Sequence, residues 1–223
     1  LGKNVTIAPF VVIGEHVTIG DNSIIGSHTL IEGHTTIGCD NKIGAFCAIG
    51  VEPQHKKYNG EPCVTIMGDR NVLREYISIH RGTMVDEGIT EMGSDNYLMS
   101  YAHLAHDCRI GSNITMANGA SLAGHVKVGD WTTLSAFALV YQFSRIGAYA
   151  YIGYSSAVTG DVPPAVMTSD TPGAPFGINV EGLRRRDFTP EDISAFKRAY
   201  KLLYRSNLLY DEAKEEIAAL VQT

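Results

Sequence analysis

The sequence predicts an all-β solenoid of hexapeptide repeats followed by a C-terminal α-helical hairpin. Aliphatic residues recur with a fixed period, and glycine often follows them, as at Gly14, Gly44 and Gly153. Near the C-terminus the apolar residues instead recur every three or four positions, as in a helix. The main observation is an aliphatic residue at every sixth position, in three runs: Ile7, Ile13, Ile19, Ile25, Ile31, Ile37, Ile43, Ile49; Met67, Leu73, Ile79; and Met92, Leu98, Leu104, Ile110, Met116, Leu122, Val128, Leu134, Val140, Ile146, Ile152, Val158.

Residues 1–163 carry these repeats and are predicted to form a narrow triangular prism. Each hexad offers two inward positions, one large and aliphatic and one small, such as Cys47 or Cys108, which we expect to fill the core. Three hexads make one 18-residue coil, and coils stack about 4.8 Å apart through parallel strand pairing. We expect glycine where each short strand turns a corner without a Cβ clash. A period of six excludes a helical solenoid, whose apolar period is 3.6.

The repeat lapses twice, and each lapse predicts a loop leaving a corner of the prism. Residues 55–66 keep the phase but place His55 and Glu61 where aliphatic residues belong, and residues 85–91 add seven residues. Long excursions on a rigid scaffold often carry binding residues.

The repeats end at Pro163-Pro164, and we expect a Gly/Pro-rich connector over residues 164–188 and a helical domain over 189–223. Thr189 supplies an N-cap and Pro190 a first-turn proline. The chain begins at Leu1 without methionine and stops at Thr223, so this sequence predicts a truncated helical tail. The apolar faces of the two helices are Ile193, Phe196, Tyr200, Leu203, Tyr204 and Ile217, Leu220, Val221.

The composition narrows the function. The chain has 223 residues, 44% apolar and 19% charged, which suits one domain-sized core. No apolar run can cross a bilayer and no export signal is visible, so we expect a soluble cytoplasmic protein. The four cysteines lack Cys-x-x-Cys spacing and are expected to be free thiols. A net charge of −6 argues against nucleic-acid binding.

Histidines mark the candidate site, which must lie on an outer face and use a neighbouring subunit because the prism has no internal space. His106 is followed 18 residues later by Gly124 and after another 18 by Gln142, so the three stack on one edge. A base beside a bare backbone N–H suits acyl transfer. His103 and His125 are nearby in sequence. Alternatively, these histidines are solvated corner residues.

A zinc site is the other interpretation of the histidines, since three histidines at a subunit interface can hold a catalytic metal. His103, His106 and His125 take the sixth, third and fourth places of their hexads, so they need not converge, and we expect no metal. Basic residues gather in residues 184–205, where seven cations face three carboxylates. That tail is expected to bind phosphate or an acidic partner.

The chain resembles the UDP-N-acetylglucosamine O-acyltransferase family, which begins lipid A synthesis. The resemblance rests on residues 102–107 (AHLAHD), 122–126 (LAGHV), 142–143 (QF) and 175–185 (PFGINVEGLRR), in the right order along nearly the whole chain. It implies a left-handed parallel β-helix, a homotrimer with sites between neighbouring prisms, no cofactor, and a 3-hydroxyacyl donor carried by the phosphopantetheine of acyl carrier protein. The basic tail would then dock the acidic carrier protein.

The resemblance also implies residue roles. His106 would be the general base that deprotonates the glucosamine 3-hydroxyl, Gly124 would supply the oxyanion N–H, and Asp107 would orient His106. The residues matched to the sugar and diphosphate are Gln54, His55, Lys57, His103 and His125; those matched to the nucleotide are Gln142, Asn179, Glu181 and Arg185; and the residues matched to the acyl chain are Asn118 and Tyr154.

Three positions depart from the family pattern. His55 stands where aspartate is usual, which leaves a 2,3-diamino sugar, acylated on nitrogen, as an alternative to N-acetylglucosamine. Tyr141 replaces a common histidine. Tyr154 stands where glycine often lets a long chain pass, about 2.7 coils or about 13 Å along the prism from His106, which predicts acyl chains near ten carbons over fourteen.

Three rival functions share the predicted scaffold. The first is the related UDP-3-O-acylglucosamine N-acyltransferase, which usually has an N-terminal domain that this sequence lacks. The second is a metal-dependent hydratase of the γ-carbonic anhydrase type. The third is a non-enzymatic solenoid, which should show a flat face of threonines; only Thr35-Thr36 and Thr132-Thr133 hint at one.

Overall fold

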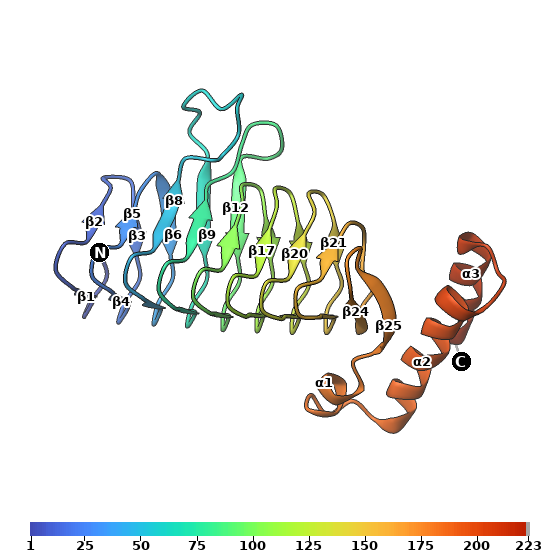
Figure 1. The fold of residues 1–223 in the computed structure, drawn as a ribbon. Coiled ribbons are helices and arrows are strands. Elements are labelled where there is room, and N and C mark those ends of the chain that lie inside the picture. Colours follow the sequence, from blue (N-terminus) through green and yellow to red (C-terminus); the bar gives the residue numbers. More distant parts are fainter. Residues whose placement is uncertain (222–223) are drawn as a thin grey trace.

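The computed structural model describes residues 1–221, and in that range the repeats form a three-sided parallel β-helix with helices beyond one end (Figure 1). Each 18-residue coil contributes one short strand to each of three sheets, which we call faces A, B and C. Residues one coil apart pair in register, as Thr115 does with Thr133 on face A. The predicted hexad period is therefore the structural period.

The strands of face A are β1 (Thr6–Ile7), β4 (Ile24–Ile25), β7 (Lys42–Ile43), β10 (Val72–Leu73), β13 (Tyr97–Leu98), β16 (Thr115–Met116), β19 (Thr133–Leu134), β22 (Tyr151–Ile152), β24 (Val166–Ser169) and β25 (Ala174–Ile178). Those of face B are β2 (Val12–Ile13), β5 (Leu30–Ile31), β8 (Ala48–Val51), β11 (Ser78–His80), β14 (His103–Leu104), β17 (Ser121–Leu122), β20 (Leu139–Val140) and β23 (Ala157–Val158). Those of face C are β3 (Thr18–Ile19), β6 (His34–Ile37), β9 (Val64–Met67), β12 (Ile89–Met92), β15 (Arg109–Ile110), β18 (Lys127–Val128) and β21 (Arg145–Ile146).

The core is a column of aliphatic side chains inside the prism. The second residue of a two-residue strand points inward, as Leu104 and Leu122 do, and both are fully buried. Small residues such as Ala120 fill the remaining inward position. Cys47 and Cys108 are buried in the core as predicted, and burial raises the pKa of the Cys108 thiol to about 12.

The corner glycines serve close packing between coils more than the turn itself. A Cβ added to Gly26 would lie 2.6 Å from the backbone carbon of Gly44 in the next coil. The left-handed turn positions are instead held by other residues, including Phe46 at φ 58° and Tyr101 at φ 65°. We expected glycine to relieve the turn; the structure shows that the approach of the next coil requires it.

The two loops begin and end earlier than predicted. The first follows β8 and ends where β9 begins at Val64, so it spans residues 52–63 instead of 55–66. The second lies between β11 and β12 and spans residues 81–88 instead of 85–91. Lys42 pairs with Val72 and Val72 with Tyr97, which adds 12 and 7 residues to the 18-residue coil. The interruption of the repeat gives the length of each insertion but not its place within the coil.

The segment after Pro164 is more ordered than the predicted connector. β24 continues face A by pairing in parallel with β22, and β25 turns back antiparallel to β24 and covers the edge of that face. α1 (Val180–Arg184) follows. Residues 164–188 are therefore largely strand and helix, because the last coil needs a partner that closes its exposed sheet edge.

The two longer helices, α2 (Pro190–Arg205) and α3 (Tyr210–Val221), pack against each other beyond the end of the β-helix. The N-terminus of α2 has the predicted cap: the Thr189 side chain accepts from the Asp192 N–H while the Asp192 carboxylate accepts from the Thr189 N–H. Two parts of the predicted helical domain, residues 222–223 and the side chain of Val221, lie outside what the structure describes. Among the described helices, none has the length and apolar character needed to cross a membrane.

Candidate active site

The candidate site lies on the edge where face B turns into face C, which we call the histidine edge (His106, Gly124, His125 and Gln142). The predicted stacking occurs, because a Cβ added to Gly124 would lie 2.6 Å from the His106 Cε1 atom. Only glycine leaves room for the imidazole above it. The Gly124 N–H donates to no group in the described part of the chain, so it is free to meet a ligand oxygen.

His106 is held by a buried carboxylate. Its Nδ1 lies 2.8 Å from Oδ2 of Asp107, which is 1% exposed. Because a carboxylate only accepts, the Nδ1 carries the proton and the Nε2 is left as a base. Burial acts to raise the pKa of Asp107, but hydrogen bonds from His106 and Thr83 outweigh it and hold that pKa below its usual range. Asp107 therefore stays ionised beside the base.

The 81–88 loop supplies the other partners of Asp107. Thr83 donates its N–H to Asp107 Oδ1 at 2.8 Å and its hydroxyl to Oδ2 at 2.6 Å. The Asp107 N–H donates to Thr90 Oγ1 at 2.8 Å. Sequence reasoning missed Thr83; the only signal was that this insertion lies in the coil just before His106.

His125 converges on the same carboxylate, contrary to the prediction that the histidines need not meet. Its ring lies 5.2 Å from that of His106, and its Nε2 is 3.7 Å from Asp107 Oδ2. Its Nδ1 lies 3.1 Å from Asp86, and its ring stacks on Phe143 at 4.4 Å. The third and fourth hexad places are adjacent on one corner, so residues a coil apart there do converge. The prediction holds only for His103, which is on face B.

The side chains of His106, Asp107 and His125 are the described group that could hold a metal ion, with ligand atoms within 4.8 Å of one another. Their hydrogen bonds also satisfy them without an ion. Asp107 receives donors from Thr83 and His106, and His125 has Asp86. The donor set therefore suits a hydrogen-bonded catalytic dyad as well as it suits an ion.

His103 lies on face B beside the histidine edge and is neutral at pH 7. Burial, with smaller effects of His80 and His106, lowers its pKa to about 4. Its Nδ1 lies 2.7 Å from the Ser78 hydroxyl. His80, which sequence reasoning also missed, is buried against it with its Nδ1 2.5 Å from the Glu52 carbonyl. His103 can therefore hydrogen-bond to a ligand without carrying charge.

A groove of about 510 Å³ runs from the histidine edge along face B. Gln54, His103, His106 and Gly124 line its polar end, and Tyr141 lies on its exposed rim. Its floor is apolar and is formed by Ala105, Leu122, Ala123, Leu139, Val140, Ala157 and Val158. The groove can hold an aliphatic chain with its reactive end at His106.

The 52–63 loop brings further predicted residues to this end. His55 meets the ring of His106 edge to face, with centroids 5.3 Å apart, and Gln54 lines the groove. Lys57 is exposed on the same loop and does not line the groove. Arg81 fixes the base of this loop through hydrogen bonds to the Tyr58 hydroxyl and the Gly50 carbonyl.

Other predicted residues lie on different edges of the same chain. Asn179, Glu181 and Arg185 belong to α1 and its cap, next to the corner between faces C and A, where Asn179 donates to the Tyr149 carbonyl. Asn179 and Arg185, together with Trp131, border a cavity of about 100 Å³ that His106 does not line, and Glu181 lies outside it.

Asn118 and Tyr154 lie at the corner between faces A and B, and neither lines the groove. Tyr154 is 70% exposed and contacts Phe137 edge to face. The 13 Å estimate counted only the distance along the axis and omitted the width of face B. The direct route from His106 to Tyr154 in one chain is therefore longer and crosses that face.

Known proteins match this chain over most of its length. The family model described as Udp N-acetylglucosamine O-acyltransferase, Domain 2, matches residues 161–223, and the bacterial transferase hexapeptide model matches residues 1–33. Acyl-[acyl-carrier-protein]--UDP-N-acetylglucosamine O-acyltransferases of Janthinobacterium sp. (strain Marseille) and Herminiimonas arsenicoxydans are 52% and 51% identical to it over 180 residues, 81% of this chain and 69% of each relative.

The solved structures that this chain resembles include further UDP-N-acetylglucosamine acyltransferases. The UDP-N-acetylglucosamine acyltransferase of Bacteroides fragilis 9343 has a TM-score of 0.95 at 39% identity, covering 98% of this chain and 85% of its own. The enzyme of Campylobacter jejuni has a TM-score of 0.93 at 32% identity, with coverage of 98% and 85%. These structures confirm the predicted fold class, a left-handed parallel β-helix with a C-terminal helical part.

Proposed function

Because the chain belongs to the acyl-[acyl-carrier-protein]--UDP-N-acetylglucosamine O-acyltransferase family of lipid A synthesis, we propose that it moves an (R)-3-hydroxyacyl group from acyl carrier protein to the 3-hydroxyl of UDP-N-acetylglucosamine. The observation that carries this proposal is the His106–Asp107 dyad beside the free Gly124 N–H, at the polar end of an apolar groove. A base, an oxyanion donor and a chain-binding surface thus adjoin one another.

The proposed reaction begins when the His106 Nε2 removes the proton from the sugar hydroxyl. The oxygen attacks the thioester carbonyl carbon, and the resulting oxyanion accepts a hydrogen bond from the Gly124 N–H. The intermediate then collapses, the C–S bond breaks, and the thiolate takes the proton from the His106 imidazolium. Asp107 stabilises that imidazolium and keeps the Nδ1 proton in place.

The acceptor sugar is proposed to lie between the 52–63 loop and the histidine edge. Gln54, His55 and Lys57 would contact the sugar and diphosphate from the loop, and His103 and His125 from the edge. His55 stands against His106 in place of the usual aspartate. A 2,3-diamino sugar, acylated on nitrogen, is therefore the second acceptor that we propose to test.

The acyl chain is proposed to occupy the apolar groove of face B. Asn118 and Tyr154 lie one corner away, so a role for them in chain selection requires the chain to cross face B or a neighbouring copy to bring its own corner to this groove. The preference for chains near ten carbons is derived from the axial distance of about 13 Å, so the prediction that we test here is that Tyr154 limits the length of the chain. Tyr154→Gly should lengthen the preferred chain, and an unchanged preference would remove Tyr154 from this role.

A homotrimer would complete the site. The corner between faces A and B carries an aromatic ladder (Phe10, His28, Phe46, Tyr76 and Tyr101), stacked at 4.8 to 5.1 Å and largely exposed. An exposed apolar stripe favours burial between copies. If that corner faces a threefold axis, face B of one copy meets face A of the next.

The same arrangement would bring the nucleotide residues to the catalytic base. The histidine edge would lie beside the neighbour's corner between faces C and A, which carries Asn179, Glu181 and Arg185. Gln142, on the histidine edge, would meet the nucleotide from the other side. We propose that each site takes its base from one copy and its nucleotide contacts from the next.

No cofactor is needed for this reaction, since the carrier protein brings the activated thioester. We propose the cytoplasm as its compartment, because all four cysteines are free, as is usual in a reducing environment.

Mass spectrometry of the products tests the function directly. Wild-type protein is offered UDP-N-acetylglucosamine or its 2,3-diamino analogue, each with a series of 3-hydroxyacyl carrier proteins. We expect ester formation on UDP-N-acetylglucosamine, and His106→Ala should lower kcat by about 10² to 10⁴. Absence of any acylated sugar contradicts the proposed reaction, and His106→Ala activity within a few-fold of wild type contradicts the proposed base.

A further inference from the structure

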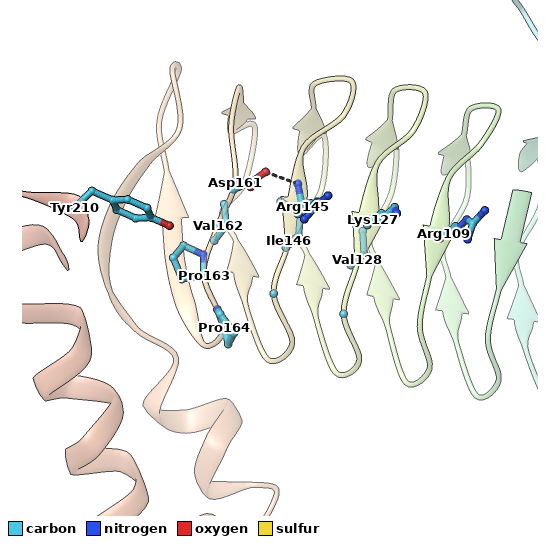
Figure 2. Close-up of a pocket in the computed structure, with 12 residues that line it drawn as sticks. Arg109, Lys127, Val128, Arg145, Ile146, Asp161, Val162, Pro163, Pro164 and Tyr210 are labelled. Atoms are coloured by element: carbon cyan, nitrogen blue, oxygen red, sulfur yellow. Dashed lines mark hydrogen bonds between the residues drawn. The ribbon is translucent and has the colours of Figure 1, made fainter. Parts of the chain in front are cut away.

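A row of three cations runs along face C, starting beside the catalytic edge. Arg109, Lys127 and Arg145 occupy the same outward position on β15, β18 and β21, and each pairs in register with the next. We call this row the cation ladder. Figure 2 shows the three side chains on adjacent strands, at one side of a groove of about 510 Å³ that Tyr210 of α3 also lines.

The ladder is short of counter-ions. Arg109 pairs with Glu87 at 2.6 Å and lies opposite Glu91 of β12 in the preceding coil, and the backbone N–H of Arg145 donates to Asp161. In the described part of the chain, the side chains of Lys127 and Arg145 form no ion pair. Like charges on directly paired strand positions destabilise a sheet. The ladder therefore favours binding of an anion that would remove this repulsion.

The spacing of the ladder selects the form of that anion. Its rungs repeat at the strand spacing of about 4.8 Å. Residues at positions i and i+4 of a helix have Cβ atoms about 5 to 6 Å apart. An acidic helix that lies parallel to the axis of the prism can therefore place one carboxylate near each of two successive cations of the ladder.

We propose that the cation ladder is the docking surface for an acidic helix of the acyl carrier protein. This inference rests on the proposed function, which supplies the partner. Arg109 follows His106 by three residues, so the ladder starts within about 10 Å of the base. A carrier docked on face C would deliver its thioester around the histidine edge, with the acyl chain passing into the groove on face B.

This location replaces the docking surface expected from the sequence. The basic tail includes Arg198, Lys201 and Arg205 of α2, which line a separate groove together with Glu216. Figure 1 shows α2 and α3 beyond the C-terminal end of the β-helix, whereas β15 directly follows the corner that carries His106. Within one chain, the ladder is thus nearer to the reacting atoms than the cations of α2 are.

The test measures carrier binding without the sugar substrate. The double variant Lys127→Glu/Arg145→Glu is compared with Arg198→Glu/Lys201→Glu, which reverses two charges on the tail. Fluorescence anisotropy reports the Kd for labelled 3-hydroxyacyl carrier protein at low and moderate salt. We expect the ladder variant to raise Kd at least tenfold and to weaken its salt dependence, while the tail variant stays within twofold of wild type.

Other results overturn the proposal. The first is a wild-type Kd for the ladder variant, and the second is a larger loss of carrier affinity in the tail variant than in the ladder variant. The third is no carrier binding by the wild-type protein at low salt, and the fourth is a ladder variant that has a higher KM for UDP-N-acetylglucosamine but binds the carrier normally. Turnover with a 3-hydroxyacyl pantetheine thioester is measured separately. It should be equal in wild type and the ladder variant, and its absence from wild type counts against the proposed function but not against ladder-dependent binding.

Discussion

Gly124 shows at the scale of one residue how the site depends on the stacking of coils. Its position one coil after His106 was readable from the 18-residue arithmetic, and the structure leaves 2.6 Å between an added Cβ and the imidazole. The backbone there needs no positive φ, so any effect of a side chain comes from contact alone.

We therefore predict that Gly124→Ala lowers kcat by about 10²-fold, because a base moved by about 1 Å loses its alignment with the hydroxyl. The control is Gly177→Ala, where an added Cβ meets nothing within 4 Å. Steady-state kinetics with both variants check this. Equal activity of Gly124→Ala and Gly177→Ala would show that the position of the His106 ring is not critical.

His103 gives a pH-dependent contribution to stability. Its pKa is about 4 in the folded chain, chiefly through burial, and near 6.5 when unfolded. As the pH falls, His103 takes up a proton in the unfolded chain before it does so in the folded chain. Its contribution to the unfolding free energy is therefore complete above pH 6.5 and is lost as the pH falls toward 4. His103→Asn should remove up to about 3 kcal/mol of the difference in unfolding free energy between pH 7 and pH 4.

Urea unfolding of wild type and His103→Asn, at a fixed protein concentration, measures that difference. His80 changes in the same direction, because burial also lowers its pKa, so the variant retains part of the wild-type pH dependence. Identical pH profiles for the two proteins would contradict the buried neutral state of His103.

Residue positions in the sequence predicted the His106–Gly124 column but not the convergence of His125 on Asp107. Side chains at neighbouring hexad places leave the same corner, and whether they meet depends on the left-handed turn at His125, φ 64°, and on its stacking with Phe143. Thr83 and Asp86 were unpredictable for another reason, since a loop outside the repeat has no phase to place its side chains.

At the scale of elements, the 81–88 loop supports the proposed catalytic pair, His106 and Asp107. Thr83 satisfies both oxygens of Asp107, and a hydrogen bond to a charged group contributes about 1.5 to 3 kcal/mol. Thr83→Val keeps the shape but removes the hydroxyl, so we predict a fall in kcat of roughly tenfold or more with little change in KM. Thr83→Ser restores the hydroxyl and should restore kcat.

The pH–rate profile separates this positioning role from a general loss of folding. Removal of the hydroxyl changes the environment of Asp107, so the acid limb of kcat for Thr83→Val should move relative to wild type, and the Ser variant should return it. If Thr83→Val reduces activity only in proportion to the amount of folded protein, the loop has no role beyond structure.

The sequence predicted the elements unevenly. The hexads predicted the strands well, because each needs an inward aliphatic residue, and Thr189-Pro190 predicted the start of α2 through its local capping. β24 and β25 were not predicted, because Pro163-Pro164 indicates the end of the repeats. The edge of face A nevertheless pairs with a further strand, and no hexad pattern marks that strand in the sequence.

At the scale of the whole molecule, one chain places its candidate residues on three different edges. His106 is on the edge between faces B and C, Asn179 and Arg185 are beside the corner between C and A, and the aromatic ladder follows the corner between A and B. The resemblance to a known family implied His106, Asn179 and Arg185 and a site between neighbouring prisms, but it did not give the aromatic ladder or the edge of the chain on which each residue lies. A closed trimer is the arrangement that we propose to reunite them.

Complementation between inactive variants tests this shared site most directly. His106→Ala and Arg185→Ala are each expected to be nearly inactive as pure proteins. After the two are unfolded, mixed in equal amounts and refolded together, random trimers should recover about a quarter of the wild-type activity, because one site in four combines an intact base with an intact neighbour. A mixture no more active than the variants alone would contradict a site built from two copies.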